Sequence, residues 1–111
     1  MIHINIVALL LFLHFMMDFF FQSHYISTHK SKSMLVCLLH ALWYTTVFAW
    51  FGLVFYLVTL FTHFVIDAVT SRITSRLYPN HIHWFFVVIG FDQMLHVFLL
   101  MWLYVITQGL P

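Results

Sequence analysis

Long apolar runs separated by two short polar segments form the main pattern of this chain. Residues 4–22 and 84–107 are each apolar over about the 20 residues that a helix needs to cross a bilayer. Residues 34–69 form one apolar run, which is too long for one span and fits two spans joined by a tight turn. Trp50-Phe51-Gly52 is the predicted turn, because Gly permits a bend and Trp suits the membrane interface. The pattern predicts four membrane-spanning helices, at about 4–22, 34–50, 53–70 and 84–107.

The polar segments at 23–33 and 71–83 contain every basic Lys and Arg side chain of the protein, namely Lys30, Lys32, Arg72 and Arg76. With four spans, both segments lie on the same side of the membrane. Cytoplasmic loops carry an excess of Lys and Arg, so we expect both polar loops to face the cytoplasm. The structural alternative has three spans, with residues 34–69 partly re-entrant.

The composition also indicates a helical membrane protein. The chain is 64% hydrophobic and 6% charged, with a mean hydropathy of +1.02, whereas about a quarter of the residues in soluble domains are charged. We therefore expect an all-α, polytopic protein with a single transmembrane domain over residues 1–111. A net charge of +1 from so few groups excludes nucleic-acid binding, which needs many basic side chains on one face. The single Cys37 excludes an internal disulfide and a cysteine-rich metal site.

The acidic residues inside the apolar runs follow one spacing rule. Each of the three lies four residues from a histidine, in the pairs His14 and Asp18, His63 and Asp67, and Asp92 and His96. Residues four apart share one face of a helix. A charged side chain within a bilayer costs a few kcal/mol or more, and interhelical polar contacts return only about 0.6 kcal/mol on average. The pairs therefore indicate a functional cluster rather than helix packing alone.

The depth of these residues in the membrane follows from counting 1.5 Å per residue from the basic loops. The three pairs and a histidine of the second span fall in one layer, roughly 5–18 Å below the cytoplasmic surface. We therefore expect convergence of His14, Asp18, His40, His63, Asp67, Asp92 and His96.

Histidine and carboxylate side chains are ligands that suit Zn²⁺ and similar divalent ions. The expected metal ligands are His14, Asp18, His40, His63, Asp67 and His96. Because these donors exceed the four that one zinc ion needs, the site is either multinuclear or contains Asp side chains that orient the His ligands. Bound zinc lowers the pKa of its water to about 7 and so supplies a hydroxide that attacks phosphoester or acyl groups. Asp92 is the expected general base, and Gln22 and Gln93 are the expected substrate contacts.

The motifs also occur in a fixed order along the chain. They are a His-x3-Asp-Phe-x2-Gln start, a basic loop, a His in the second span, a His-Phe-x2-Asp segment followed by a basic residue, and a final Asp-Gln-x2-His. The residues are His14, Asp18, Phe19 and Gln22, then Lys30, then His40, then His63, Phe64, Asp67 and Arg72, and lastly Asp92, Gln93 and His96.

This ordered set resembles a family of short, uncharacterised inner-membrane proteins of bacteria and phages that is defined as a domain of unknown function. The resemblance covers nearly the whole chain and implies a multi-pass protein of the bacterial inner membrane. As an analogy of spacing only, His-x3-Asp is similar to the metal motif of zinc-dependent phospholipases C and related membrane hydrolases.

The function favoured by these residues is a metal-dependent hydrolase whose lipid-like or phosphoester substrate has its scissile bond at headgroup depth. The chain has no Glu for a His-Glu-x2-His metalloprotease and no Gly-x-Ser-x-Gly nucleophile motif. Two non-enzymatic alternatives remain. The His and Asp side chains could relay protons or metal ions across the membrane, or they could join a small bundle that binds a membrane partner.

A few further side chains receive a simple interpretation at this stage. Lys30 and Arg72 would lie at the depth of a lipid phosphate, although membrane topology alone accounts for basic residues there. Tyr44 is assigned to the membrane interface, together with Trp43 and Trp50.

Overall fold

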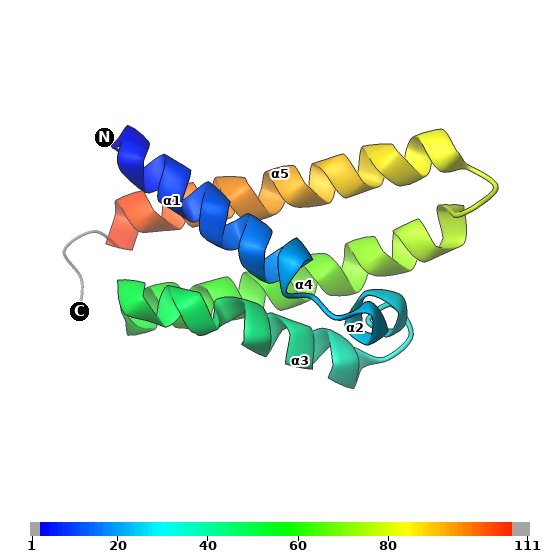
Figure 1. The fold of residues 1–111 in the computed structure, drawn as a ribbon, viewed down its shortest axis with the longest axis horizontal. Coiled ribbons are helices and arrows are strands. Elements are labelled where there is room, and N and C mark those ends of the chain that lie inside the picture. Colours follow the sequence, from blue (N-terminus) through cyan, green and yellow to red (C-terminus); the bar gives the residue numbers. More distant parts are fainter. Residues whose placement is uncertain (1–2, 108–111) are drawn as a thin grey trace.

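Helices joined by short connections make up the protein over the residues that the computed structural model describes, which are 3–107 (Figure 1). Residues 1–2 and 108–111 of the expected domain lie outside them. The elements are α1 (Ile4–Phe15), the π-helical turn η1 (Met16–Phe20), α2 (His24–His29), α3 (Met34–Thr45), the 3-10 helix η2 (Thr46–Phe51), α4 (Leu53–Leu77) and α5 (Ile82–Thr107).

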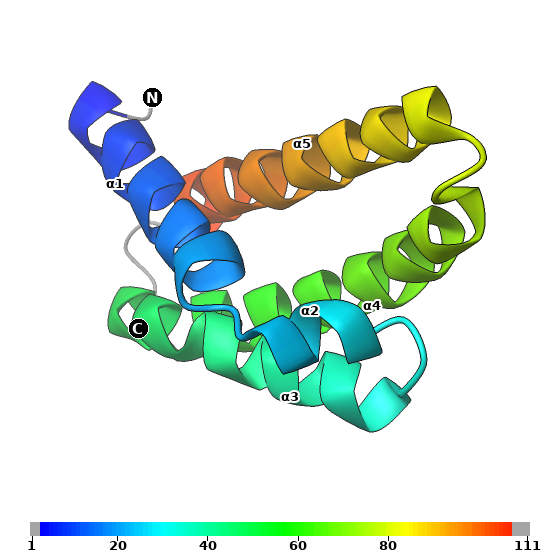
Figure 2. The same cartoon turned by 45° about the vertical axis from the view of Figure 1, so that its right-hand side comes forward.

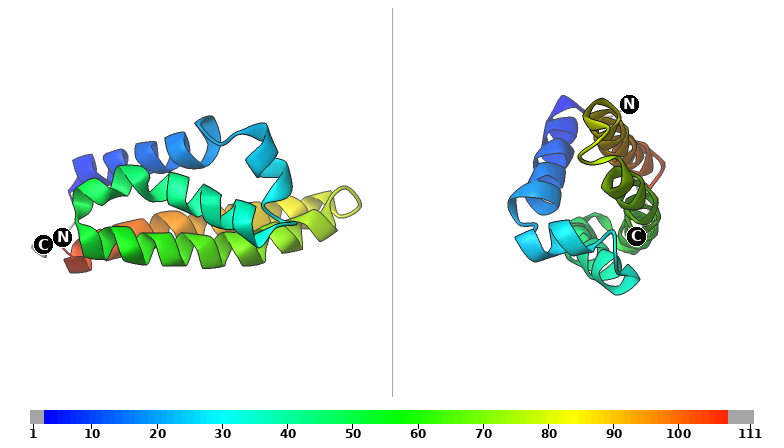
Figure 3. Two further views of the ribbon diagram at one scale, coloured as in Figure 1. Left: turned by 90° about the horizontal axis from the view of Figure 1, so that it is seen from below. Right: turned by 90° about the vertical axis from the view of Figure 1, so that its right-hand side faces the viewer.

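The two longest helices, α4 and α5, form an antiparallel hairpin that organises the molecule (Figure 1). Helix α3 lies along α4, and α1 crosses α5 (Figure 2). Viewed end-on, α1, α3, α4 and α5 surround a common interior, with the short α2 at one end (Figure 3). Side chains from all four long segments can therefore meet inside the bundle.

A glycine separates the helical segment α3–η2 from α4 at the predicted turn. Helix α3 continues as η2 to Phe51, and α4 begins at Leu53. Gly52, between them, has φ 109° and ψ 164°, a conformation that is open almost only to glycine. The structure confirms the predicted helix break at Trp50-Phe51-Gly52.

The polar segments contain more helix than the sequence predicted. Residues 71–77, expected in a loop, continue α4 to Leu77. Their hydroxyls bond to the helix's own carbonyls: Thr74 donates to the Ser71 carbonyl (3.1 Å) and Ser75 to the Arg72 carbonyl (2.9 Å). The polar residues 71–77 therefore extend α4 beyond its apolar part and do not end the helix. The first polar segment likewise contains α2, whose N-cap Ser23 accepts a hydrogen bond from the Ile26 N–H (3.2 Å).

The distribution of side chains is that of a membrane protein, with polar groups inside and large apolar groups outside. His40, His63 and Asp67 are no more than 1% exposed, whereas Phe61 is 68% and Phe98 is 58% exposed. Three helices are long and apolar enough to cross a membrane, judged by length and composition: Met34–Phe51, Leu53–Leu77 and Ile82–Thr107. The segment Ile4–Phe20 is apolar but shorter, so the fourth span stays a prediction.

The apolar core fills one end of the bundle and separates the polar interior from that end. It consists of Leu10, Met17, Tyr44, Phe48, Phe55, Leu100 and Leu103. Along each helix these apolar residues lie mainly on the side of the histidines that is remote from the two polar loops. The polar interior is therefore closer to the loops than to the chain ends.

Candidate metal centre

The histidine and aspartate side chains singled out in the sequence meet in the bundle interior. Each is no more than 8% exposed. We call this group the His/Asp cluster: His14 and Asp18 from α1 and η1, His40 from α3, His63 and Asp67 from α4, and Asp92 and His96 from α5. The sequence prediction of convergence is confirmed by the contacts that follow.

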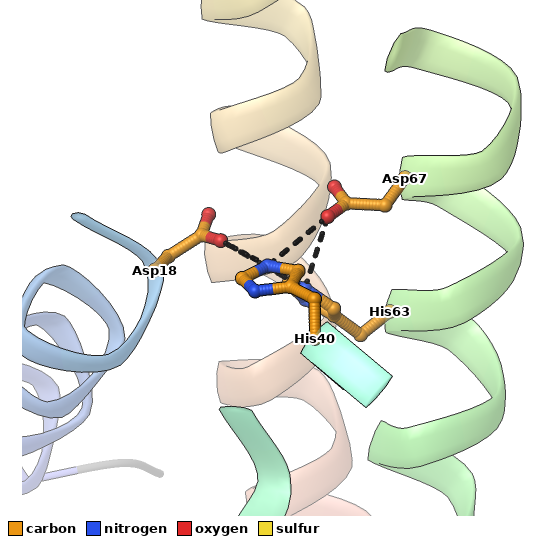
Figure 4. Close-up of side chains that lie close together, drawn as sticks. All are labelled: Asp18, His40, His63 and Asp67. Carbon is orange, nitrogen blue, oxygen red and sulfur yellow. Dashed lines mark hydrogen bonds and ion pairs between the residues drawn. The ribbon is translucent and has the colours of Figure 1, made fainter. Parts of the chain in front are cut away.

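Asp67 lies at the middle of the cluster and contacts three histidines. Its Oδ2 is 3.2 Å from His40 Nε2 and 3.3 Å from His63 Nε2 (Figure 4). Its Oδ1 is 3.1 Å from His96 Nε2. One carboxylate thus joins α3, α4 and α5.

Asp18 approaches His40 and His63 from the side opposite Asp67 (Figure 4). Its Oδ1 is 2.9 Å from His40 Nε2 and 3.8 Å from His63 Nε2. Asp18 is part of η1, and π-helical turns of this kind occur often at functional sites because the extra residue turns a side chain to a new direction. The two rings are therefore enclosed between two carboxylates.

The donor atoms of Asp18, His40, His63 and Asp67 are spaced as a metal ion requires. All four lie within 4.8 Å of one another, and the nitrogen–oxygen distances given above run from 2.9 to 3.8 Å. A tetrahedral zinc ion with ligands at about 2.0–2.2 Å separates them by about 3.3–3.6 Å. Two imidazoles and two carboxylates at this spacing fit a four-coordinate ion.

His63 has a hydrogen-bonding vacancy at this centre. Among the described residues its Nε2 has no hydrogen-bond partner, although Asp67 and Asp18 are close by. The ring itself is fixed by stacking on Tyr44 (3.8 Å between centroids) and on His96 (4.2 Å). This buried imidazole nitrogen is held in place beside two carboxylates and makes no hydrogen bond to a described residue, so it is suited to donate its lone pair to a metal ion.

A second group of donors consists of Asp18, Asp92 and His96, which also lie within 4.8 Å of one another. Asp92 Oδ1 is 3.3 Å from His96 Nε2 and accepts a hydrogen bond from the Thr70 hydroxyl (2.5 Å). Because Asp18 belongs to both groups, the two groups are adjacent parts of one cluster.

His14, predicted as a ligand, belongs to neither group of metal-spaced donors. Its Nδ1 hydrogen-bonds the Tyr44 hydroxyl (2.8 Å) and its Nε2 hydrogen-bonds Gln93 Oε1 (2.6 Å). The nearest oxygen of Asp18 is 3.9 Å away. Both ring nitrogens are thus engaged, and the ligand role of His14 stays a prediction.

The two predicted glutamine contacts lie in different places. Gln93 is within the cluster, where its amide donates to Asp18 Oδ2 (3.3 Å) and to Asp92 Oδ2 (2.9 Å). Gln22 lies at the edge and accepts a hydrogen bond from Lys30 Nζ (3.1 Å). Gln93 therefore links two carboxylates, and its role as a substrate contact stays a prediction.

Sequence reasoning did not place two further side chains at the centre. Tyr44, expected at the membrane interface, is 1% exposed and contacts both His14 and His63. The available signal was its spacing, four residues after His40, which places both on one face of α3. Lys30, attributed to topology, donates to Asp67 Oδ2 (3.2 Å) because the connection after α2 folds back over the bundle.

The charge on Lys30 is maintained by the carboxylates. Burial alone lowers the pKa of this ammonium group, but the charges of Asp67 and Asp18 outweigh burial and raise its pKa above the ordinary value. Lys30 is therefore a permanent cation at the polar end of the cluster.

A cavity of about 520 Å³ opens beside the cluster on the side of the polar loops. Asp18, Asp67, Asp92 and Gln93 lie on its wall, so the cluster is accessible from it. Gln22 and Lys30 line the same cavity. The arrangement combines a buried donor set with an adjoining space of the size in which small ligands bind.

The comparisons with known proteins give a family and no activity. The sequence model of a family described as a protein of unknown function (DUF3307) matches residues 6–110, a range that contains the whole His/Asp cluster. No curated protein and no solved structure matches the chain.

Proposed function

Since the chain belongs to DUF3307, a family of proteins of unknown function, we propose from its site that it is a membrane-embedded, metal-dependent hydrolase. The His/Asp cluster is the metal centre. The observation that carries this proposal is the set of four buried donors within 4.8 Å, one of which, His63 Nε2, lacks a hydrogen-bond partner among the described residues.

Charge balance supports a divalent cation at this position. Asp18, Asp67 and Asp92 are three carboxylates in surroundings where each charge costs a few kcal/mol or more. Lys30 is the single ammonium that contacts any of them among the described residues. With neutral histidines, as metal binding requires, a divalent ion bound by Asp18, His40, His63 and Asp67 would supply the remaining positive charge. Zinc suits this mixture of nitrogen and oxygen ligands.

The chemistry of hydrolysis follows from the remaining cluster residues. A bound zinc ion would supply an acidified water as nucleophile. Asp92, held by Thr70 and Gln93 on the cavity wall, is placed to accept the water's proton. As the water oxygen replaced the ester oxygen on the phosphorus or acyl carbon, Asp92 would return this proton to the leaving alkoxide.

Ion conduction, the main alternative, finds less support in the fold. A relay needs polar groups that continue on both sides of the cluster. On the side remote from the polar loops, Leu10, Phe48, Leu100 and Leu103 are buried in the apolar core. The 520 Å³ cavity opens on the other side, as expected for a site that receives and releases a substrate from one face.

The proposed placement is the bacterial inner membrane, with four spans and the basic loops in the cytoplasm. The segment Ile4–Phe20 would be the shortest span, about 25 Å at 1.5 Å per residue. A bilayer core of about 30 Å accommodates such a helix by local thinning.

The test is metal analysis of the detergent-purified protein. We expect roughly one tightly bound zinc ion per chain, held by the four-donor group. Protein that contains no divalent ion, and whose melting temperature does not rise when zinc is added, would overturn the proposal.

A further inference from the structure

The cavity beside the cluster has two chemically different walls. Hydroxyl groups of α4 and the lysines after α2 form one wall, and the cluster carboxylates form its floor. Aromatic and aliphatic side chains of η1, α5 and the connection between α4 and α5 form the other, namely Phe19, Tyr78, Phe85 and Ile89. In Figure 2 the connection between α4 and α5 lies at the right-hand end of the bundle, remote from the chain ends. A ligand that fills this space must be polar at one end and apolar at the other.

The polar wall offers an anion two ammonium groups and one hydroxyl. Thr70, Thr74 and Ser75 of α4 also line the cavity, but their hydroxyls already donate to Asp92 and to helix carbonyls, which leaves the Ser71 hydroxyl. Lys30 and Lys32 approach from the connection between α2 and α3. Ammonium and hydroxyl groups together are typical partners of phosphate oxygens.

One of these hydroxyls has no partner within the described part of the chain. Ser71 Oγ is buried, in a residue that is 8% exposed, and no described group hydrogen-bonds it. A buried hydroxyl without a partner costs about 1–3 kcal/mol. Because Ser71 lies on the cavity wall, a ligand oxygen in the cavity would satisfy it.

The apolar wall continues to the outside of the bundle. Phe19 is 47% exposed and Tyr78 is 58% exposed, although both also line the cavity. In a membrane-embedded bundle these surfaces face lipid near the headgroup region. A hydrocarbon chain attached to the ligand can therefore leave the cavity sideways into the bilayer.

We propose that this cavity binds a lipid phosphate ester, with its phosphate on Lys30, Lys32 and Ser71 and its hydrocarbon chain along Phe19 and Tyr78. This inference rests on the proposed function and names its substrate class. The cluster carboxylates line the same cavity, so the phosphate ester bond would lie beside Asp92 and the proposed metal ligands Asp18 and Asp67. The volume of about 520 Å³ accommodates a phosphate with its glycerol or similar linker.

Binding of phosphatidic acid to the full chain in maltoside micelles, which contain no phosphate, tests this inference. Ligand-induced rise in melting temperature is the readout, with diacylglycerol and inorganic phosphate as the two partial ligands. We expect phosphatidic acid to bind at least tenfold more tightly than either. Equal binding of diacylglycerol would overturn the phosphate site, and equal binding of inorganic phosphate would overturn the lipid part of the proposal.

Variants locate the site. The Lys30→Gln and Lys32→Gln double variant is expected to weaken phosphatidic acid binding by about tenfold or more, because charge-assisted hydrogen bonds are lost. Ser71→Ala should weaken it severalfold. The matched control for Ser71→Ala is Thr59→Val, since the Thr59 hydroxyl is also buried without a partner among the described residues but lines a different, small cavity. Arg76→Gln, outside the cavity, controls for the loss of charge.

Metal content, measured on the same samples, separates this inference from the proposed function. Variants that keep their zinc but bind phosphatidic acid like the unaltered chain would overturn the lipid site alone. A protein that binds phosphatidic acid at this site but never binds a metal ion would overturn the hydrolase proposal alone.

Discussion

At the scale of single residues, the three carboxylates have unequal positions. Asp67 and Asp18 both face His40 and His63, with nitrogen–oxygen distances between 2.9 and 3.8 Å. Asp92 contacts neither of these rings within salt-bridge distance among the described residues, and its oxygens are engaged by Thr70, Gln93 and His96. The geometry therefore distinguishes the two carboxylates that face both rings, which we propose as metal ligands, from Asp92, which we propose as the general base.

This separation predicts different results for the three Asn variants. Asp67→Asn and Asp18→Asn should each lose the bound metal and any hydrolytic activity together, because the side chain keeps its size but loses the charge that holds the ion. Loss of one ligand should lower metal affinity by about 10-fold at least. Asp92→Asn should retain metal and lose turnover, as measured by metal analysis and product release.

The control for this series is His81→Ala, which removes an exposed histidine away from the cluster. This variant should change neither the metal content nor the rate of product release. If all three Asn variants kept full metal content, the carboxylates would be structural contacts, and a bundle that binds a membrane partner would become the better account.

Tyr44 offers a second prediction at the same scale, since its hydroxyl and its ring have separate contacts. Tyr44→Phe removes the hydrogen bond to His14 Nδ1 but keeps the stacking on His63. We expect a loss of about 1 kcal/mol in the free energy of unfolding, with metal binding retained. Tyr44→Ala removes both contacts and should also weaken metal binding, because the His63 ring loses its support.

Thermal unfolding in detergent measures the change in the free energy of unfolding. Tyr56→Phe, at a half-buried tyrosine of α4, is the matched control. A Tyr44→Ala variant with unchanged metal affinity would show that His63 does not depend on this stacking.

At the scale of elements, the turn between η2 and α4 sets the register of two helices. Gly52 at φ 109° reverses the chain without a loop, so His40 on α3 and His63 on α4 are brought to the same level. Their ring centroids are 5.0 Å apart. The turn therefore positions half of the four-donor group.

Gly52→Ala should destabilise the protein by about 1–3 kcal/mol, because an L-residue is strained at this conformation. Gly90→Ala is the matched control. Gly90 lies within α5, a Cβ added there meets open space, and Ala favours a helix by about 0.5–1 kcal/mol over Gly. The melting temperatures of the two variants should therefore move in opposite directions. A Gly52→Ala protein as stable as the unaltered chain would contradict the role assigned to this turn.

At the scale of the whole molecule, the polar cluster lies closer to one end of an apolar bundle. The large exposed side chains are apolar on all long helices, and the basic residues are confined to the end where the cavity opens. Because cytoplasmic loops carry an excess of Lys and Arg, we expect this bundle to lie in the membrane with its basic end at the cytoplasm.

Cysteine labelling in intact cells tests this orientation, with native Cys37 replaced by Ala. Cysteines at the exposed positions Lys32 and Arg76 should be inaccessible to an impermeant reagent until the membrane is opened. A cysteine at Trp50, which is 93% exposed at the opposite end, should react at once. Labelling of positions 32 and 76 from opposite sides would rule out the four-span topology.

The sequence by itself determined the local features of this protein. The lengths of the apolar runs predicted the long helices, Gly52 marked the break, and the four-residue spacing placed each His and Asp pair on one helix face. These features depend on residues close together in the chain, so the sequence expresses them directly. The same rule, applied to His40 and Tyr44, would have placed Tyr44 inside.

Only the tertiary structure decided which groups meet across helices. The four-residue spacing fixes a face of one helix, but the rotation and register between helices decide that His40 lies between Asp18 and Asp67 and that Lys30 reaches Asp67. The same packing brings Tyr44 and Gln93 within hydrogen-bond distance of the two ring nitrogens of His14. Spacing within a helix is set by its 3.6-residue turn, whereas contacts between helices are set by the packing of many side chains at once, which no single motif encodes.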